Sequence, residues 1–154
     1  MNLVDEFIFK APFRAMLAGP SNCGKTSFII EILKNPQKYI YPPPDRIMYC
    51  YTRMQESYKN LQNVELVEGL PDMNLFNHNT NNLLVLDDLL EECEENKAIQ
   101  TLFTVDSHHK NISTFFMTQN LFSRGKCFRT ISLNCDYFIL FKCPRDPSQI
   151  FNFA

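Results

Sequence analysis

Short apolar segments alternate with polar or helix-like stretches along the whole chain. Residues 83–86, Leu-Leu-Val-Leu, form an unbroken apolar run, which is expected of a strand buried on both faces. Alternating strands and helices are typical of an α/β fold, with a mainly parallel sheet flanked by helices. The predicted strands are residues 13–18, 46–51, 64–67, 83–86, 113–118 and 137–142.

Helical periodicity appears between these strands. Residues 26–34 place Phe28, Ile29, Ile32 and Leu33 on one face, and Asn35 followed by Pro36 ends that helix. A second stripe consists of Ala98, Ile99, Leu102 and Phe103, and the acidic run over residues 91–95 before it is typical of a solvated helix start.

The length and charge of the chain restrict its class. A chain of 154 residues with 45% apolar content is sufficient for one core, so residues 1–154 are expected to form a single domain. The pattern over residues 146–154 predicts the opening of a further helix, so a domain truncated at its C-terminus stays an alternative. The net charge of -2 excludes a basic protein that coats polyanions, and any nucleic-acid contact must be a local patch.

Cysteine spacing and the N-terminal sequence indicate an intracellular protein that is not secreted. The six cysteines contain no C-x-x-C pair, which fits neither a zinc site nor a secreted disulfide framework. The N-terminus lacks the apolar region of a signal peptide, and no segment approaches the roughly 20 apolar residues of a membrane span. We therefore expect no membrane partner.

The pattern Gly-x-x-x-x-Gly-Lys-Thr over residues 19–26 lies between the first predicted strand and the first predicted helix. In a P-loop, glycines let backbone N–H groups turn inward around the β- and γ-phosphates, where bulky side chains would block them. Lys25 adds a cation and Thr26 a magnesium ligand. An ordinary strand-to-helix turn is the structural alternative. The predicted ATP-binding residues are Gly19, Pro20, Ser21, Asn22, Cys23, Gly24, Lys25, Thr26 and Ser27.

Two acids follow the apolar strand 83–86. This position puts Asp87 at the carboxyl edge of the sheet, where ligands bind in open α/β folds, and it matches a Walker B motif. Asp87 is expected to hold Mg²⁺ through water, and Asp88 to orient and deprotonate the attacking water. Glu91 and Glu92 are alternative bases, and a helix N-cap followed by a surface acid would look the same.

Gln119 closes the predicted strand 113–118, where an amide can sense the γ-phosphate or position water. A simple strand-terminating polar residue is equally compatible with the sequence. His108 and His109 have no cysteine or acid at ligand spacing, so they are expected at the surface or near a helix end.

The segments 108–122, 129–134 and 137–146, together with both motifs, closely resemble the genome-packaging ATPases of Polinton (Maverick) elements and related viruses, within the FtsK/HerA superfamily. The likeness runs from about residue 13 to residue 150. It implies an additional-strand, catalytic-acid (RecA-like) P-loop NTPase core. It also implies a homo-oligomeric ring, with a hexamer as the expected form, that drives double-stranded DNA into a capsid, in the host cytoplasm or nucleus or in the virion.

Mapped by residue, the resemblance places the nucleotide loop on residues 19–26, the Walker B acids on Asp87 and Asp88, and the polar sensor on Gln119. Two departures stand out. Much of the superfamily has Glu where this chain has Asp88, which shortens the carboxylate by one methylene. The sequence also ends soon after the last core strand.

Basic residues exceed acids between residues 106 and 146. Arg124 and Lys126, near Gly125, are candidates for a loop that contacts DNA phosphates without reading bases, although a solvated face would look similar. We hypothesise that Arg129 is an arginine finger for the neighbouring subunit, with Arg124 and Arg145 as alternatives and a surface ion pair as the ordinary interpretation. The basic residues of the stretch are Lys110, Arg124, Lys126, Arg129, Lys142 and Arg145.

The leading functional hypothesis is a DNA-translocating ATPase. The first alternative is a small-molecule P-loop kinase, which would need an acceptor pocket and an Arg-bearing lid; no clear lid segment is visible in the sequence. The second alternative is an assembly scaffold that binds ATP without useful turnover, an idea that Asp88 in place of Glu keeps open.

Overall fold

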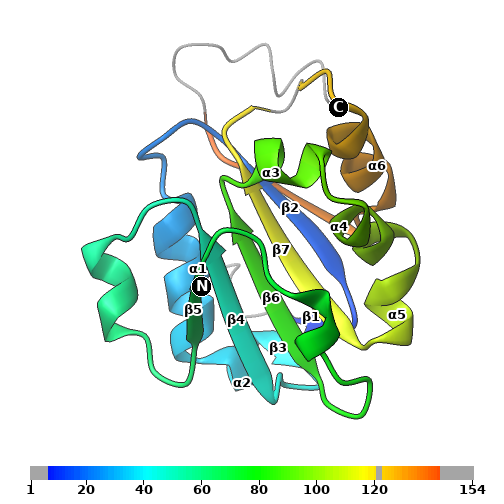
Figure 1. Cartoon of the computed structure of the whole chain (residues 1–154). Coiled ribbons are helices and arrows are strands. Elements are labelled where there is room, and N and C mark those ends of the chain that lie inside the picture. Colours follow the sequence, from blue (N-terminus) through cyan, green and yellow to red (C-terminus); the bar gives the residue numbers. More distant parts are fainter. Residues whose placement is uncertain (1–6, 121–122, 143–154) are drawn as a thin grey trace.

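The centre of the computed structural model, which describes residues 7–120 and 123–142, is a six-stranded sheet in the order β5-β4-β6-β7-β2-β8 (Figure 1). Every neighbouring pair in it is parallel. The strands are β2 (Arg14–Ala18), β4 (Arg46–Tyr51), β5 (Glu65–Glu68), β6 (Asn82–Asp87), β7 (Ile112–Thr118) and β8 (Tyr137–Leu140). All six predicted strands are confirmed, with ends shifted by at most two residues.

Helices cover both faces of this sheet (Figure 1). One face carries α1 (Lys25–Lys34) and α2 (Pro36–Tyr39). The other face carries α3 (Leu90–Glu94), α4 (Lys97–Thr101), the π-helix η4 (Leu102–Asp106), α5 (Ser107–His109) and α6 (Lys126–Asn134). None of the helices in the described ranges has the length and apolar character of a membrane span.

Strand β6 shows why its sequence is an unbroken apolar run. Leu83 and Val85 pack on the α1 face, whereas Leu84 and Leu86 pack on the α3–α6 face, and all four are fully buried. Successive residues of a strand point to opposite sides, so a strand covered on both faces needs apolar residues at every position. The core is accordingly two apolar layers separated by the sheet.

Strand β7 lies between the P-loop strand β2 and the acid-bearing strand β6. Ala18 pairs with Thr118 and Asp87 pairs with Met117, so the carboxyl ends of the three strands coincide. The α/β fold class with a mainly parallel sheet flanked by helices is therefore confirmed.

Smaller elements depart from the sequence prediction. Pro36 ends α1 as expected but also begins the one-turn α2, because proline fits the first helical position. Ala98 is exposed, whereas Ile99, Leu102 and Phe103 are buried as predicted. The sequence did not predict the two-residue strands β1 (Phe9–Lys10) and β3 (Ile40–Tyr41), or the 3-10 helices η2 (Glu56–Asn60) and η3 (Met73–Leu75), which are too short to show periodicity.

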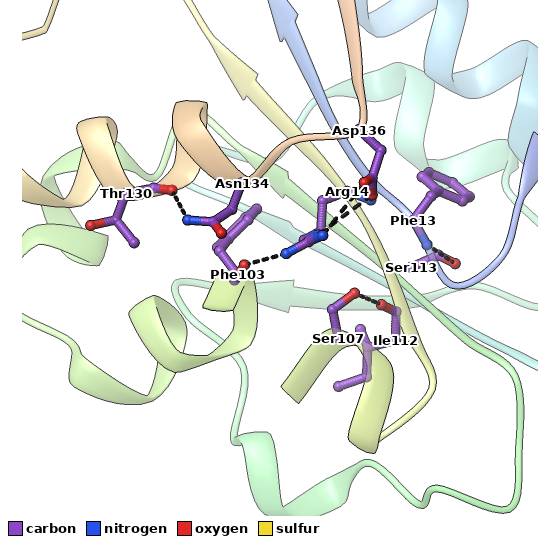
Figure 2. A network of polar contacts seen from close by, with 9 residues as sticks. All are labelled: Phe13, Arg14, Phe103, Ser107, Ile112, Ser113, Thr130, Asn134 and Asp136. Atoms are coloured by element: carbon purple, nitrogen blue, oxygen red, sulfur yellow. Dashed lines mark hydrogen bonds and ion pairs between the residues drawn. The ribbon is translucent and has the colours of Figure 1, made fainter. Parts of the chain in front are cut away.

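Polar contacts link helices and loops to the strands at the amino-terminal edge of the sheet (Figure 2). Arg14, at the start of β2, donates a hydrogen bond of 2.6 Å to the carbonyl of Phe103 in η4 and pairs at 3.4 Å with Asp136, just before β8. The Ser107 hydroxyl donates to the carbonyl of Ile112 at 2.8 Å, tying α5 to β7. These links lie at the edge opposite the P-loop, so they support the sheet without occupying its carboxyl edge.

Candidate nucleotide-binding site

A cavity of about 590 Å³ lies at the carboxyl edge of the sheet, beside the P-loop. It contains most of the residues that the sequence singles out, although Gly19, Pro20 and Cys23 are not part of its lining. A ligand at this edge would meet groups from α1, β6 and β7 at once. The lining residues are Ser21, Asn22, Gly24, Lys25, Thr26, Ser27, Ile30, Gln55, Ser57, Asp87, Asp88, Met117, Thr118 and Gln119.

Two glycines shape the P-loop. Gly24 has φ of 106°, a left-handed conformation that other L-residues rarely adopt. A Cβ at Gly19 would lie 2.7 Å from Cβ of Phe141 and 2.8 Å from Sγ of Cys23. Both positions therefore require glycine, one for its backbone angle and the other for the close approach of the chain after β8.

Lys25 lies buried against its own loop. Its ammonium donates hydrogen bonds to the carbonyls of Gly19 and Pro20, the latter at 2.9 Å, and lies 3.8 Å from Sγ of Cys23. The loop thus folds around the ammonium of its own lysine. Phosphate oxygens in the cavity would compete with these carbonyls for the ammonium, because charge-assisted hydrogen bonds are stronger than those to neutral acceptors.

The start of α1 offers further donors. Its N-cap residue is Gly24, which provides no side-chain hydrogen bond to the helix terminus. The first backbone N–H groups of a helix have no partner within the helix, and the helix dipole adds partial positive charge there. Together with Lys25, this terminus is suited to bind an anion such as a nucleotide phosphate.

Asp87, the last residue of β6, accepts two hydrogen bonds on the same oxygen. The hydroxyls of Tyr49 and Tyr58 each donate to Asp87 Oδ2 at 2.7 Å. Burial is the largest cause that raises the pKa of both tyrosines, and the negative charge of Asp87 raises it further. Both phenols therefore keep their protons and act as donors to the carboxylate.

Asp88 has an unusual backbone for a non-glycine residue, with φ of 57°. Its N–H donates to the carbonyl of Met117 at 3.2 Å, and its carbonyl accepts from the Thr52 hydroxyl at 2.9 Å. Although the residue is exposed, partial loss of hydration raises the pKa of the Asp88 carboxyl, and repulsion from Asp87 and Glu92 adds to this. Lys25 acts in the opposite direction. A raised pKa makes the carboxylate a better proton acceptor.

Gln119 follows β7 and lines the cavity, at the edge where the sequence predicted it. Arg129 does not line it. That residue lies exposed on α6, which packs on the opposite face of the sheet from α1, and within the described ranges its guanidinium has no ion pair. Arg145 lies outside the described residues. A contribution of Arg129 to catalysis would therefore have to be made to another subunit.

The donor set fits Mg²⁺ held jointly with a nucleotide. The Thr26 hydroxyl and the Asp87 carboxylate line the same cavity. Across the described ranges, histidines, cysteines and acids form no group of three or more able to hold a metal on their own. Mg²⁺ commonly binds through one or two protein oxygens plus substrate phosphates and waters, which is the arrangement that these two residues permit.

Sequence reasoning missed one wall of the site. Gln55 and Ser57 line the cavity, and Tyr49, Thr52 and Tyr58 contact the two acids. All five belong to β4 or to the segment that follows it through η2. Their spacing matches no motif, and only the proximity of β4 to β6 in the sheet brings them to Asp87.

No protein-family model matches this sequence, nor does any curated protein. Its fold is similar to that of the genome packaging NTPase B204 from Sulfolobus turreted icosahedral virus 2. The structure of that protein in complex with sulfate has a TM-score of 0.62 and 14% identity, over 90% of this chain and 78% of that chain. The complex with ATP-gammaS has a TM-score of 0.56 and 13% identity, over 91% and 79% of the two chains. This chain therefore has the fold of a viral genome packaging NTPase.

Proposed function

We propose that this chain is a P-loop ATPase that hydrolyses ATP to ADP and phosphate and uses the energy to package double-stranded DNA into a viral or virus-like capsid. The observation that carries the proposal is the convergence of Lys25, Asp87 and Asp88 on one cavity at the carboxyl edge of the sheet. The likeness to B204, which is described as a genome packaging NTPase and was solved with ATP-gammaS, supports it.

Within the loop of residues 19–27, the backbone N–H groups from Ser21 onward and the Lys25 ammonium would hold the triphosphate. Thr26 and Asp87 would hold Mg²⁺ with it. When bound, the ion neutralises part of the charge that develops on the phosphate oxygens. Gln119, at the end of β7, would sense the γ-phosphate or position the attacking water.

Asp88 would serve as the base. The water oxygen forms a bond to the γ-phosphorus while the bond from that phosphorus to the β,γ-bridging oxygen breaks. The proton of the water passes to the Asp88 carboxylate, and the electrons of the broken bond stay with ADP. The raised pKa of Asp88 favours this transfer, and Glu91 or Glu92 would take the role if Asp88 is too short.

The candidate DNA-contacting residues lie near the carboxyl edge of the sheet, where the cavity lies. Arg124 and Lys126 precede or begin α6, Lys142 follows β8, and all three are exposed. Lys110 instead precedes β7 at the opposite edge and pairs with Asp106 at 3.6 Å. We therefore assign the phosphate contacts to Arg124, Lys126 and Lys142. Such contacts are independent of sequence and weaken as salt is raised.

Motor activity of this kind would require a homo-oligomeric ring, such as a hexamer, and a capsid protein as partner. Arg129 is exposed on α6 and does not line the cavity of its own subunit. This position is compatible with an arginine finger that reaches the γ-phosphate bound by a neighbouring subunit. A particle-mass measurement with an ATP analogue would give the number of subunits.

The proposed function is tested by phosphate release from ATP and Mg²⁺, with and without double-stranded DNA. A motor gives release that DNA stimulates. A small-molecule kinase requires an acceptor and shows no response to DNA, and a scaffold binds ATP without turnover. Either of the last two results would overturn the motor assignment.

A further inference from the structure

The Asp87 carboxylate is held asymmetrically. Its Oδ2 accepts both tyrosine hydrogen bonds, from Tyr49 and from Tyr58, each 2.7 Å long. Among the described residues, Oδ1 has no hydrogen-bond partner, and the residue lines the cavity. One oxygen therefore accepts both hydrogen bonds, and the other accepts none from the described residues.

We propose that Tyr49 and Tyr58 are positioning residues that fix the Asp87 carboxylate in one orientation, with Oδ1 presented to the metal side of the nucleotide site. This rests on the proposed function, because the role of Asp87 toward Mg²⁺ is part of it.

Burial explains why the contact persists. Tyr49 is fully buried and Tyr58 is 1% exposed, so neither hydroxyl can exchange its acceptor for bulk water. The two rings lie 4.6 Å apart and pack against each other. Rotating Asp87 away would leave Tyr58 without its carboxylate acceptor and Tyr49 with only the weak thioether acceptor Met117 Sδ, 4.0 Å away, and this penalty holds the carboxylate in place.

The two tyrosines reach Asp87 by different routes. Tyr49 lies in β4, which is hydrogen-bonded to β6, and it shares the α1 face of the sheet with Val85. Tyr58 comes from η2, in the segment whose Gln55 and Ser57 line the cavity. The position of that wall is thereby tied to the orientation of Asp87. Groups that orient a ligand in this way strongly affect metal affinity in other sites.

A purely structural role for the hydroxyls is the competing explanation. Loss of either hydroxyl would then lower the stability of the fold without changing the affinity for metal. Tyr51 provides a matched control, because it also lies in β4 and its ring is 5.6 Å from that of Tyr58, but it donates no hydrogen bond to Asp87.

The experiment compares Tyr49→Phe, Tyr58→Phe and Tyr51→Phe with the parent chain. Mn²⁺ binding to the complex with ATP-gammaS is measured by electron paramagnetic resonance, and ATP-gammaS binding in EDTA by calorimetry. Metal-free thermal melting reports folding. We expect Mn²⁺ affinity to fall about tenfold or more in Tyr49→Phe and Tyr58→Phe. Tyr51→Phe should match the parent, and ATP-gammaS affinity in EDTA should be the same in all four proteins.

Parental Mn²⁺ affinity in folded Tyr49→Phe and Tyr58→Phe would overturn the positioning role while leaving the ATPase proposal intact. A parent chain that binds ATP-gammaS in neither condition would instead overturn the proposed function, and the positioning role with it. The Mn²⁺ readout does not depend on turnover, so it also separates the positioning role from an effect on the base.

Discussion

The Thr52 hydroxyl donates a hydrogen bond of 2.9 Å to the main-chain carbonyl of Asp88. Asp88 has a left-handed backbone with φ of 57°, which is unfavourable for most non-glycine residues. The contact comes from the segment after β4, whereas Asp88 follows β6. One side chain thus helps to hold the candidate base in a strained conformation, a feature often found at functional sites.

Replacing Thr52 by valine keeps the shape of the side chain but removes the donor. We expect Thr52→Val to lower the rate of ATP hydrolysis several-fold while ATP affinity stays near the parental value, because the carboxylate is displaced but the P-loop is intact. Steady-state kinetics and calorimetry measure the two quantities. Thr104→Val, at an exposed helical position, is the control. A normal rate in Thr52→Val would show that Asp88 needs no support from Thr52.

Lys25→Ala should reduce ATP affinity at least tenfold. The lost cation would have made charge-assisted hydrogen bonds to phosphate, each worth about 1.5–3 kcal/mol. Calorimetry with ATP and Mg²⁺ checks the affinity. Lys34→Ala, at the exposed end of the same helix, should bind as the parent does. Unchanged affinity in Lys25→Ala would contradict the P-loop assignment.

Asp88→Asn should retain binding of ATP and Mg²⁺ but lose hydrolysis, since an amide can hold water yet cannot accept its proton. Asparagine tolerates the left-handed backbone, so the loop geometry is kept. Normal turnover in the variant would move the base to Glu91 or Glu92.

Asp88→Asn should also change how the stability of the metal-free protein depends on pH. The pKa of Asp88 is higher in the folded chain than in the unfolded chain. The stability that this group contributes is therefore complete below the unfolded pKa and is lost as the pH rises through the folded pKa. Asparagine does not ionise, so Asp88→Asn removes this loss of stability. Its melting temperature should exceed the parental value near neutral pH, and the difference should vanish below the ordinary aspartate pKa of 3.8. Equal melting at neutral pH would contradict the raised pKa.

Glu94 joins α3 to the start of α6. Its carboxylate accepts hydrogen bonds from the backbone N–H groups of Cys127 at 3.1 Å and Phe128 at 3.4 Å. This caps a helix that has no side-chain cap from its own N-cap residue. Glu94→Ala should lower the free energy of unfolding by about 1–2 kcal/mol in urea titrations. Glu95→Ala, at the neighbouring exposed position, should change it little.

Arg129 is tested by mixing two inactive proteins. If Arg129 serves a neighbour, Arg129→Ala combined with Lys25→Ala should recover some hydrolysis, because interfaces that join an intact loop to an intact finger reappear. Arg124→Ala treated in the same way tests the alternative finger. A silent mixture of variants that still assemble, or parental turnover by assembled Arg129→Ala alone, would rule out the role in trans.

The sequence by itself determined the elements whose signals are local. The P-loop of residues 19–26 is contiguous, and glycines with a lysine at fixed spacing are readable without any partner. Asp87 was predictable for a related reason, because an apolar run ending in an acid marks the end of a strand buried on both faces. The six strands of the main sheet were predicted from short apolar runs of the same kind, and the errors are confined to the strand ends.

Only the tertiary structure decided what surrounds those acids. Tyr49 and Tyr58 are separated from Asp87 by 38 and 29 residues, and Thr52 is 36 residues from Asp88. Their contacts depend on which strands become neighbours and in which register, and on the return of η2 to the sheet edge. Strand order is set by the packing of all the elements together. The sequence around a buried tyrosine also looks the same whether its hydroxyl donates to an acid of a functional site or to an acid with a structural role.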